Sequence, residues 1–536
     1  MMRARIDRRT LVKGAAVAGI GAAGLGATGC GADRGDVSGE QLTSAAPLPR
    51  PFRVPLPVPV TARAQRAKDG SDHYELVQRR GEMEILPGLR TEVWGYDGTF
   101  PGSTLVGRSG RTTTVRIRNS LPVPTSTHLH GGVQAASSDG YPMDLVLPPG
   151  YRHPPAGPAH AMPGMPGMPG TAKGGAAGWT LTSGAKTYTY PLDQPAATLW
   201  YHDHRMDFSA PQVWRGLAGM FLVHDDTEDA LPLPRGEKDI PLMICDRAFE
   251  EDGAFRYPSL DPSLTGRPGV EEAYMEGVTG DVVLVNGAAW PELEVSDTLH
   301  RFRIVNVSNA RRYRFALEPG PRTGSGFVQI GSDSGLLAAP LRHDELPVAP
   351  GERFDVLIDF AAYPHGSTVE LVNTLGSGGT RRVMRFRVSR REKDTSRIPG
   401  RLAEFETLRA AQAVAERRFD FRLTQGGGSR MWTVNGAPFD HAKVLASPRL
   451  GTVERWRFSS DFHHPVHLHL ARFQVVARGN GDPLASDAGW KDTVDVRPYE
   501  VVDVLARFTG QRGRYMLHCH NLEHEDMAMM ANFEVV

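Results

Sequence analysis

Short runs of alternating polar and apolar residues dominate the chain from about residue 53 onwards. Residues 112–118, 301–305 and 455–458 alternate in this way, and Gly, Pro, Asn and Asp separate such runs. Side chains of a strand point alternately to its two faces, so the pattern predicts half-buried antiparallel strands. We therefore expect an all-β fold of short strands joined by tight turns.

One combination of turn and strand occurs three times along the chain. Asp97-Gly98, Asn286-Gly287 and Asn435-Gly436 are hairpin-type turn pairs, and each is followed by a spacer and a strand-forming run. The copies lie about 150–190 residues apart, which suits one β-sandwich each. The repeat predicts three sandwich domains, at residues 53–230, 236–392 and 419–536.

Three regions depart from the strand pattern. Residues 31–52 are polar and proline-rich and are predicted to be a linker. Residues 393–418 are predicted to be a helical linker, because 402–418 is rich in Ala, Glu and Arg with apolar residues spaced by three. Residues 154–178 are predicted to be a loop, because Pro and Gly at this density exclude a helix or central strand.

Composition and charge narrow the class of protein. The chain has 536 residues, of which 40% are apolar and 23% charged, as in globular proteins with several cores. Lys and Arg total 61, as do Asp and Glu. This balance argues against nucleic-acid binding, which needs an excess of basic residues to neutralise phosphates. No segment approaches 18 consecutive apolar residues, so we expect no transmembrane helix.

The N-terminus resembles an export signal over residues 1–30. Arg8-Arg9 precedes a Gly/Ala-rich apolar stretch at 14–29, as in twin-arginine signals. Ala27-Thr28-Gly29-Cys30 resembles a lipoprotein cleavage box, with alanine in place of the usual leucine. We expect an exported, extracytoplasmic protein that is either secreted or lipid-anchored at the cell surface through Cys30.

Histidines and cysteines carry the strongest chemical signal. Only three cysteines are present, so an exported chain of this size has no disulfide framework. A His-x-His pair on a strand places both imidazoles on one face. Eleven of the 19 histidines fall into four clusters, at His128-Leu129-His130, His202-Asp203-His204, His463 to His469, and His518-Cys519-His520 with His524.

The fourth cluster indicates which metal is bound. Imidazole suits Cu, Zn, Fe and Ni, but two histidines with one thiolate and a weak axial methionine form the blue-copper arrangement. His464, Cys519 and His524 would be the equatorial ligands and Met529 the axial one. A zinc enzyme would use four ligands and leave most of these histidines unexplained.

On these four motifs the sequence resembles the three-domain multicopper oxidases, which include laccases, bilirubin oxidases, spore-coat laccases and cuprous oxidases. The resemblance covers nearly the whole chain after the signal and implies three cupredoxin-like Greek-key β-sandwich domains. It implies copper as cofactor, four ions per chain, with a trinuclear cluster between domains 1 and 3. The second repeat continues with Asn306 to Arg311 and has no His-x-His, so no catalytic copper is expected in domain 2. The implied ligands are His464, Cys519, His524 and Met529 for type 1, His128 and His467 for type 2, and His130, His202, His204, His469, His518 and His520 for type 3.

The resemblance also implies the reaction and its partners. Four one-electron oxidations at type 1 copper would be coupled to the reduction of O2 to two waters. The electron donor would be a small molecule or Cu(I). Glu525 and Asp139 match the acidic positions that deliver protons in relatives. As alternatives, Glu525 is a surface carboxylate and Asp139-Gly140 is only a turn pair.

Three functions stay open on the sequence. The first is laccase-like oxidation of phenols or aminophenols. The second is cuprous oxidation for copper detoxification, because the thioethers of Met162, Met165 and Met168 prefer Cu(I). The other interpretation of that loop is a Pro/Gly insertion with incidental methionines. The third is a non-enzymatic copper-binding cupredoxin protein, which is remote because no ligand is missing.

Overall fold

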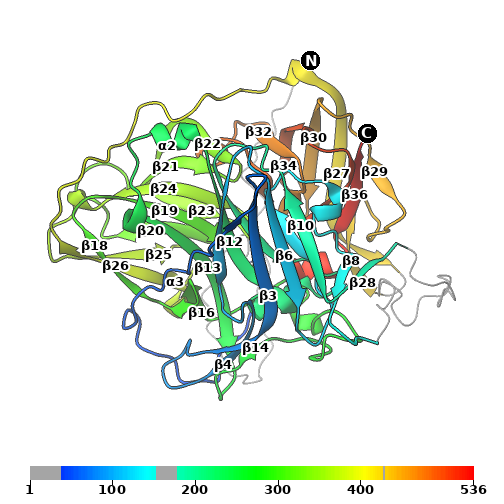
Figure 1. Ribbon diagram of the computed structural model, residues 1–536, viewed down its shortest axis with the longest axis horizontal. Helices are drawn as coiled ribbons and strands as arrows, with labels where there is room; N and C mark the ends of the chain where they lie inside the picture. The colour runs from blue at the N-terminus through cyan, green and yellow to red at the C-terminus, as the bar shows by residue number, and fades with distance from the viewer. Residues whose placement is uncertain (1–37, 153–177, 427–428) are drawn as a thin grey trace, which may run out of the picture. The chain divides into compact units, whose positions relative to one another are not determined.

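The computed structural model describes residues 38–152, 178–426 and 429–536, which form three β-sandwiches in chain order (Figure 1). The expected signal at 1–30, with Cys30, lies outside the described residues. So does nearly all of the 154–178 loop, with Met162, Met165 and Met168. In the described part of the chain, no helix is long and apolar enough to cross a bilayer. The all-β fold class expected from the alternating pattern is confirmed.

The first sandwich packs two sheets around a core that includes Tyr74, Val115, Leu129 and Phe221. Its alternating strand β6 buries every second residue, as the sequence pattern requires. One sheet contains β2 (Gln65–Arg66), β3 (Asp72–Met83), β4 (Thr91–Tyr96), β6 (Thr113–Asn119) and β10 (Ala185–Tyr190). The other contains β5 (Gly102–Arg108), β7 (Thr127–His130), β11 (Ala197–Asp203) and β12 (Ala218–His224), and a separate pair is formed by β8 (Asp144–Leu147) and β9 (Thr180–Ser183).

The second sandwich has the largest sheet, whose strands β19, β24 and β21 run side by side in green in Figure 1. Its core includes Ile304, Val356 and Phe386. The large sheet contains β13 (Asp239–Phe249), β14 (Phe255–Arg256), β16 (Val282–Val285), β17 (Ala288–Ala289), β19 (Leu299–Asn306), β21 (Phe327–Ser332), β22 (Gly335–His343) and β24 (Arg353–Asp359). The smaller sheet contains β18 (Glu292–Ser296), β20 (Tyr313–Glu318), β23 (Glu345–Val348), β25 (Thr368–Asn373) and β26 (Arg382–Arg390).

The third sandwich consists of two five-stranded sheets around Phe421, Trp456, Val504 and Phe533. One sheet contains β27 (Ala413–Gly426), β28 (Ser429–Val434), β30 (Val453–Ser460), β32 (Arg472–Arg478) and β34 (Val501–Arg507). The other contains β29 (Val444–Ala446), β31 (His464–Leu468), β33 (Thr493–Val496), β35 (Gly513–Cys519) and β36 (Met530–Val535).

Helices are short in the described residues. Asp226 to Ala230 follows the last strand of the first sandwich, and Leu522 to Asp526 follows β35. The α-helices are α1 (Ser209–Trp214), α2 (Asp226–Ala230), α3 (Gly378–Arg381) and α4 (Leu522–Asp526). The 3-10 turns are η2 (Ala136–Ser138), η3 (Gly236–Lys238), η4 (Glu272–Tyr274), η5 (Phe360–Ala362), η6 (Ala410–Gln412) and η7 (Ala485–Asp487).

The repeated turns occupy equivalent places in the three sandwiches. Both central residues of each turn have positive φ, with 58° and 73° at Asp97 and Gly98 and 54° and 76° at Asn435 and Gly436. Asn286 and Gly287 have the same conformation, at 51° and 83°. Flanking residues pair across each turn, as in the Val434–Ala437 bridge. The sequence repeat therefore marks two-residue hairpins of the kind that Asn-Gly and Asp-Gly favour.

The prediction of a helical linker at 393–418 is wrong. Residues 393–409 form neither helix nor strand, and the Ala-rich end is one 3-10 turn, η6, followed by β27, which pairs with β28 and β30. The apolar residues spaced by three do not form one helix face, because they are buried in different hydrophobic clusters. Leu402 packs with Leu337 and donates its N–H to the Ala338 carbonyl at 2.9 Å, whereas Leu408 packs with Trp490. Contacts with the sandwiches thus override the helix propensity of this segment.

The predicted linker at 31–52 is not a free spacer over its described part, 38–52. Strand β1 (Glu40–Gln41) pairs in parallel with β15 (Val278–Thr279) of the second sandwich. Leu42 and Phe52 are buried, and the Ser44 hydroxyl donates to the Asp281 carboxylate at 2.5 Å. The apolar residues among the prolines explain the difference, because they give this arm a surface to bury.

Candidate metal centres

Four strands bring the histidine clusters together. Strands β7 and β11 are neighbours in the first sandwich, and their register sets His128 opposite His202. Strands β31 and β35 are neighbours in the third sandwich, and their register sets His467 opposite His518. His204 and His469 directly follow β11 and β31. Each His-x-His pair projects from one strand face, as its spacing predicts.

Eight imidazoles from these two sandwiches converge in a buried site, which we call the eight-imidazole site. His128 Nε2 lies 3.4 Å from His467 Nε2, and the ring of His130 stacks on that of His467 with centroids 3.6 Å apart. Nε2 atoms of His469 and His518 are 3.2 Å apart. Three compact groups of possible ligand atoms occur here, namely His128, His130 and His467, then His130, His202 and His520, then His204, His469 and His518.

A second cluster lies within the third sandwich and is called here the thiolate site. His464 Nδ1 is 3.3 Å from Cys519 Sγ and 3.1 Å from His524 Nδ1, while Cys519 Sγ is 3.6 Å from His524 Nδ1. Cys519 lies in β35 and His524 in α4. Met529 is fully buried beside them, and backbone hydrogen bonds tie it to both His524 and Cys519.

The chemical state of these donors fits a metal. Burial lowers the pKa of His128, His130 and His204 well below the usual range and that of His202 to about 3, which keeps these imidazoles neutral. Backbone carbonyls accept from Nδ1 of His128 and His202, which leaves Nε2 as the ligand atom. Unpartnered ring nitrogens remain buried at His130 Nδ1, His202 Nε2, His204 Nε2 and both nitrogens of His520. Neutral imidazoles without hydrogen-bond partners are suited to a transition metal.

Both predicted acidic residues lie against the eight-imidazole site. Asp139 Oδ2 is 2.6 Å from His469 Nδ1, and Gln134 donates to Asp139 Oδ1 at 2.8 Å. The pKa of Asp139 is raised by burial. Glu525 is 1% exposed, with its carboxylate oxygens 3.2 Å from Nδ1 of His204 and Nδ1 of His518. Glu525 is therefore not a surface carboxylate.

The second sandwich covers the thiolate site. His524 Nε2 lies 3.1 Å from the carbonyl of Glu276, and the ring of Trp432 stacks on that of His524 with centroids 3.8 Å apart. Trp432 in turn donates its indole N–H to the Met275 carbonyl at 2.9 Å. The pattern analysis missed Trp432 and Glu276, because a buried Trp in a strand and an acidic surface segment are common features of sandwich proteins.

Asp492 is a further residue that the sequence analysis missed. Its carboxylate lies 3.1 Å from His130 Nε2, and its carbonyl lies 2.9 Å from His467 Nδ1. Burial alone would raise its pKa, but the charge of Arg353 holds that pKa well below the usual range. No local signal marked it, because Asp492 lies in a segment with several other charged residues, such as Asp487, Asp495 and Arg497.

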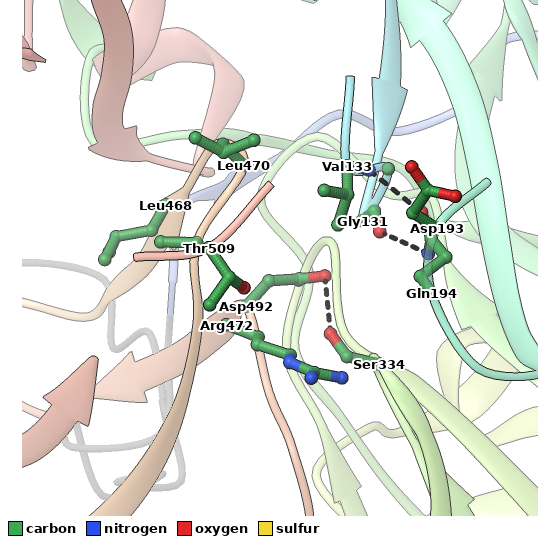
Figure 2. A pocket seen from close by; sticks show the side chains of 12 residues that line it. Gly131, Val133, Asp193, Gln194, Ser334, Leu468, Leu470, Arg472, Asp492 and Thr509 are labelled. Carbon is green, nitrogen blue, oxygen red and sulfur yellow. Dashed lines mark hydrogen bonds between the residues drawn. The ribbon is translucent and has the colours of Figure 1, made fainter. Parts of the chain in front are cut away.

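A narrow cavity approaches the eight-imidazole site where the three sandwiches meet (Figure 2). It has a volume of about 30 Å³, and in its wall the Ser334 hydroxyl donates to the Asp492 carboxylate at 3.5 Å. Gln194 donates to the Gly131 carbonyl at its edge, 3.0 Å away. Polar walls and this volume suit one or two waters, so solvent can approach the Asp492 side of His130.

Comparisons with known proteins agree with this site. Family models described as multicopper oxidase match residues 415–536 and residues 78–155 with 162–228. A laccase of Bacillus stratosphericus is 34% identical over 533 residues, which cover 90% of this chain and 98% of the relative. A bilirubin oxidase of Albifimbria verrucaria is 33% identical over 514 residues, covering 90% and 81%. The solved laccase of Pediococcus acidilactici is 28% identical, with a TM-score of 0.76 and coverage of 94% and 97%.

The fold and the histidine–thiolate clusters define a copper-dependent oxidoreductase that is built from cupredoxin-like domains and uses oxygen. The chain belongs to the multicopper oxidase family. The fold expected from the resemblance is confirmed. The assignment of each ligand to a copper type stays a prediction.

Proposed function

We propose that this chain is a laccase-like multicopper oxidase that oxidises phenols and aminophenols by single electrons and reduces O2 to two waters. The observation that carries the proposal is the convergence of His464, Cys519 and His524 beside Met529 in a fully buried core. One thiolate, two imidazoles and a thioether form the donor set of a one-electron blue-copper site.

Four coppers fit the donors of the two sites. Type 1 copper would be held by His464, Cys519, His524 and Met529, and bound copper supplies one-electron redox chemistry and a site for O2. Type 2 copper would be held by His128 and His467, whose Nε2 atoms already face each other. The type 3 pair would be held by His130, His202, His204, His469, His518 and His520.

Cys519 connects the two sites through the chain itself. It lies between His518 and His520, and successive side chains of a strand point in opposite directions. The thiol therefore faces the thiolate site while both neighbouring imidazoles face the eight-imidazole site. This arrangement supports a short covalent route for electrons that enter at His524 and leave at His518 or His520.

Proton supply is assigned to Glu525 and Asp139. Reduction of one O2 to two waters takes up four protons along with four electrons. Glu525 bridges His204 and His518 within 3.2 Å, and Asp139 is bonded to His469 on another side of the site. Carboxylates at these places can hold protons next to the imidazoles and pass them inwards.

The decisive experiment measures O2 uptake by the copper-loaded protein with a dimethoxyphenol or with stabilised Cu(I). Wild type is compared with a Met162/Met165/Met168→Ser variant. If the variant oxidises the phenol and Cu(I) at the wild-type rates, this result supports the broad laccase and makes the three methionines incidental. A Cu(I) rate that collapses in the variant while phenol oxidation persists would establish a cuprous oxidase. Copper binding without O2 uptake on either donor would establish a copper-storing protein.

Export completes the proposed function. Arg8-Arg9 and the following apolar stretch support transport by a twin-arginine route, with Cys30 as the point of cleavage or lipid attachment. Expression with Arg8→Lys and Arg9→Lys should retain the protein in the cytoplasm. Secretion of that double variant at the wild-type level contradicts the proposed route. Mass spectrometry of the mature N-terminus distinguishes a lipidated Cys30 from a free protein.

A further inference from the structure

Arg353 of the second sandwich joins all three sandwiches through its guanidinium group. The side chain is fully buried, and each of its five N–H groups has an acceptor. Nε donates to the Thr198 carbonyl of the first sandwich at 3.0 Å. Nη1 and Nη2 donate to the two carboxylate oxygens of Asp492 in the third sandwich at 2.6 and 2.5 Å. The remaining N–H groups donate to the carbonyls of Gly351 at 3.1 Å and Asp333 at 2.8 Å.

The carboxylate that Arg353 holds is the one that contacts the eight-imidazole site. Asp492 Oδ1 lies 3.1 Å from His130 Nε2, and Thr493 Oγ1 lies 3.0 Å from the same atom. Because an ionised carboxylate only accepts hydrogen bonds, His130 must carry its proton on Nε2. Its Nδ1 is then the free donor atom, and this atom is buried without a partner.

The backbone packs closely against the guanidinium and against two histidines of the site. A Cβ added to Gly131, next to His130, would lie 2.4 Å from Arg353 Nη2. A Cβ added to Gly351 would lie 3.0 Å from the ring of His520 and 3.1 Å from His130 Cε1. The turn that precedes Arg353 thus lies directly against two histidines of the site. The second sandwich, which has no His-x-His motif, still contacts the metal centre.

We infer that Arg353 is a positioning residue of the eight-imidazole site and that it acts through Asp492. It fixes the carboxylate that orients the ring of His130 and directs its Nδ1 into the site. The inference rests on the proposed assignment of copper to these histidines. A bidentate pair to a planar guanidinium restricts the carboxylate in both position and rotation, which a lysine ammonium cannot do.

Arg303 in β19 is the matched control. It is also a buried arginine of the second sandwich, at 1% exposed, and it also reaches the first sandwich. Nε and Nη2 donate to Asp239 at 2.8 Å each, and Nη2 donates to Glu228 at 2.8 Å. Its hydrogen-bond partners are these carboxylates, and neither Asp492 nor a histidine of the eight-imidazole site is among them. Loss of Arg303 therefore reports what a buried ion pair between sandwiches contributes by itself.

The test compares Arg353→Lys with Arg303→Lys in the full-length, copper-loaded protein. Copper per chain, the blue type 1 band, the type 2 electron paramagnetic resonance signal and the near-ultraviolet type 3 band are measured. For R353K we expect an intact blue band, a weakened near-ultraviolet type 3 band and ~10–100-fold easier loss of the coppers of the eight-imidazole site to a chelator, the usual effect of removing an orienting partner. For R303K we expect all signals to be retained. Equal spectra and copper loss in the two variants overturn the inference.

Two further variants keep the test independent of folding defects. In an Asp492→Asn background, R353K should add less than about twofold to copper loss if it acts through Asp492. If the effects of R353K and Asp492→Asn on copper loss are fully additive, Arg353 does not act through Asp492. Thr493→Val removes hydroxyl contacts to His130, Asp492 and His467, at 3.0, 2.9 and 3.2 Å, without changing charge. An unchanged type 2 and type 3 spectrum in Thr493→Val overturns the link to His130.

The wild-type spectrum separates this inference from the proposed function. A wild type that binds copper only at the thiolate site refutes the ligand assignment itself. A wild type with all copper classes, whose spectrum and copper retention are unaffected in R353K, refutes only the role of Arg353.

Discussion

The thiolate site and the eight-imidazole site are built in different ways. The thiolate site takes His464, Cys519 and His524 from one sandwich, in β31, at the end of β35 and in α4. The eight-imidazole site takes four histidines from the first sandwich and four from the third, and the Gly351–Arg353 turn of the second lies against it. One site takes all its ligands from a single domain, with the second sandwich only covering it, and the other depends on how three domains pack.

This difference predicts separable failures. A change confined to the thiolate ligands Cys519, His464 or His524 should abolish the thiolate site and leave the eight imidazoles in place. A change between sandwiches should do the reverse, because the ligands of the larger site keep their distances only while the domains stay packed. The predictions below test this separation, from the largest expected effect to the smallest.

Replacing the thiolate should have the largest effect. Cys519→Ser removes the soft ligand that lies within 3.6 Å of both His464 and His524. We expect loss of the blue band and a fall in turnover of at least about 10³-fold, as when one essential group of an active site is removed. The type 2 signal should persist. Loss of both signals in Cys519→Ser would contradict the independence of the two sites.

The sequence allowed the local site to be predicted more completely than the interface. His-x-His spacing and the Cys519 motif act over a few residues, and period two alone places their side chains. Asp492 and Arg353 lie 139 residues apart, and their pairing depends on packing of separate domains. Arg353-Phe354-Asp355-Val356 alternates polar and apolar residues, which is typical of a half-exposed strand and gives no sign that this arginine is buried. The helix prediction for residues 402–418 was wrong for the same reason, since tertiary contacts decided the conformation of this segment.

Removing the carboxylate that is proposed to supply protons should have the next largest effect. Glu525→Gln keeps the shape of the side chain but removes the carboxylate that lies 3.2 Å from His204 and His518. We expect O2 reduction to slow by about 10²-fold, the usual contribution of a positioned acid or base. The blue absorption should stay intact. Stopped-flow reoxidation of the reduced protein measures the step directly, and unchanged turnover would refute the role of Glu525.

Acid should weaken the packing between sandwiches before it affects either sandwich core. Glu228 in α2 of the first sandwich is buried and bonded to Arg301 and Arg303 of β19. Burial alone would raise the pKa of Glu228, but His224 and the two arginines hold it far below its ordinary value of 4.5. A depressed pKa contributes stability above the unfolded value, and this stability is lost as the pH falls below about 4.5.

The matched variant is Glu228→Gln, measured on copper-free protein so that metal release does not interfere. At pH 7 the free energy of unfolding should fall by about 3–5 kcal/mol, the usual cost of breaking a buried ion pair. As the pH falls from about 4.5 towards the much lower pKa of Glu228 in the folded state, the difference between the variant and the wild type should shrink steadily. A constant difference between them from pH 7 to pH 3 would show that the charge of Glu228 does not stabilise this junction.

The smallest effect should come from the aromatic cover of the thiolate site. Trp432→Phe keeps a ring over His524 but loses the indole N–H that donates to the Met275 carbonyl at 2.9 Å. One buried hydrogen bond contributes about 1 kcal/mol, so turnover should change by no more than about fivefold. The blue band should shift, because the stacked ring and the ligand His524 move together. The type 2 and type 3 signals should stay at their wild-type positions, since Trp432 contacts only the thiolate site among these ligands. A type 2 signal that moves in Trp432→Phe while the blue band stays unchanged would show that the two sites are not independent.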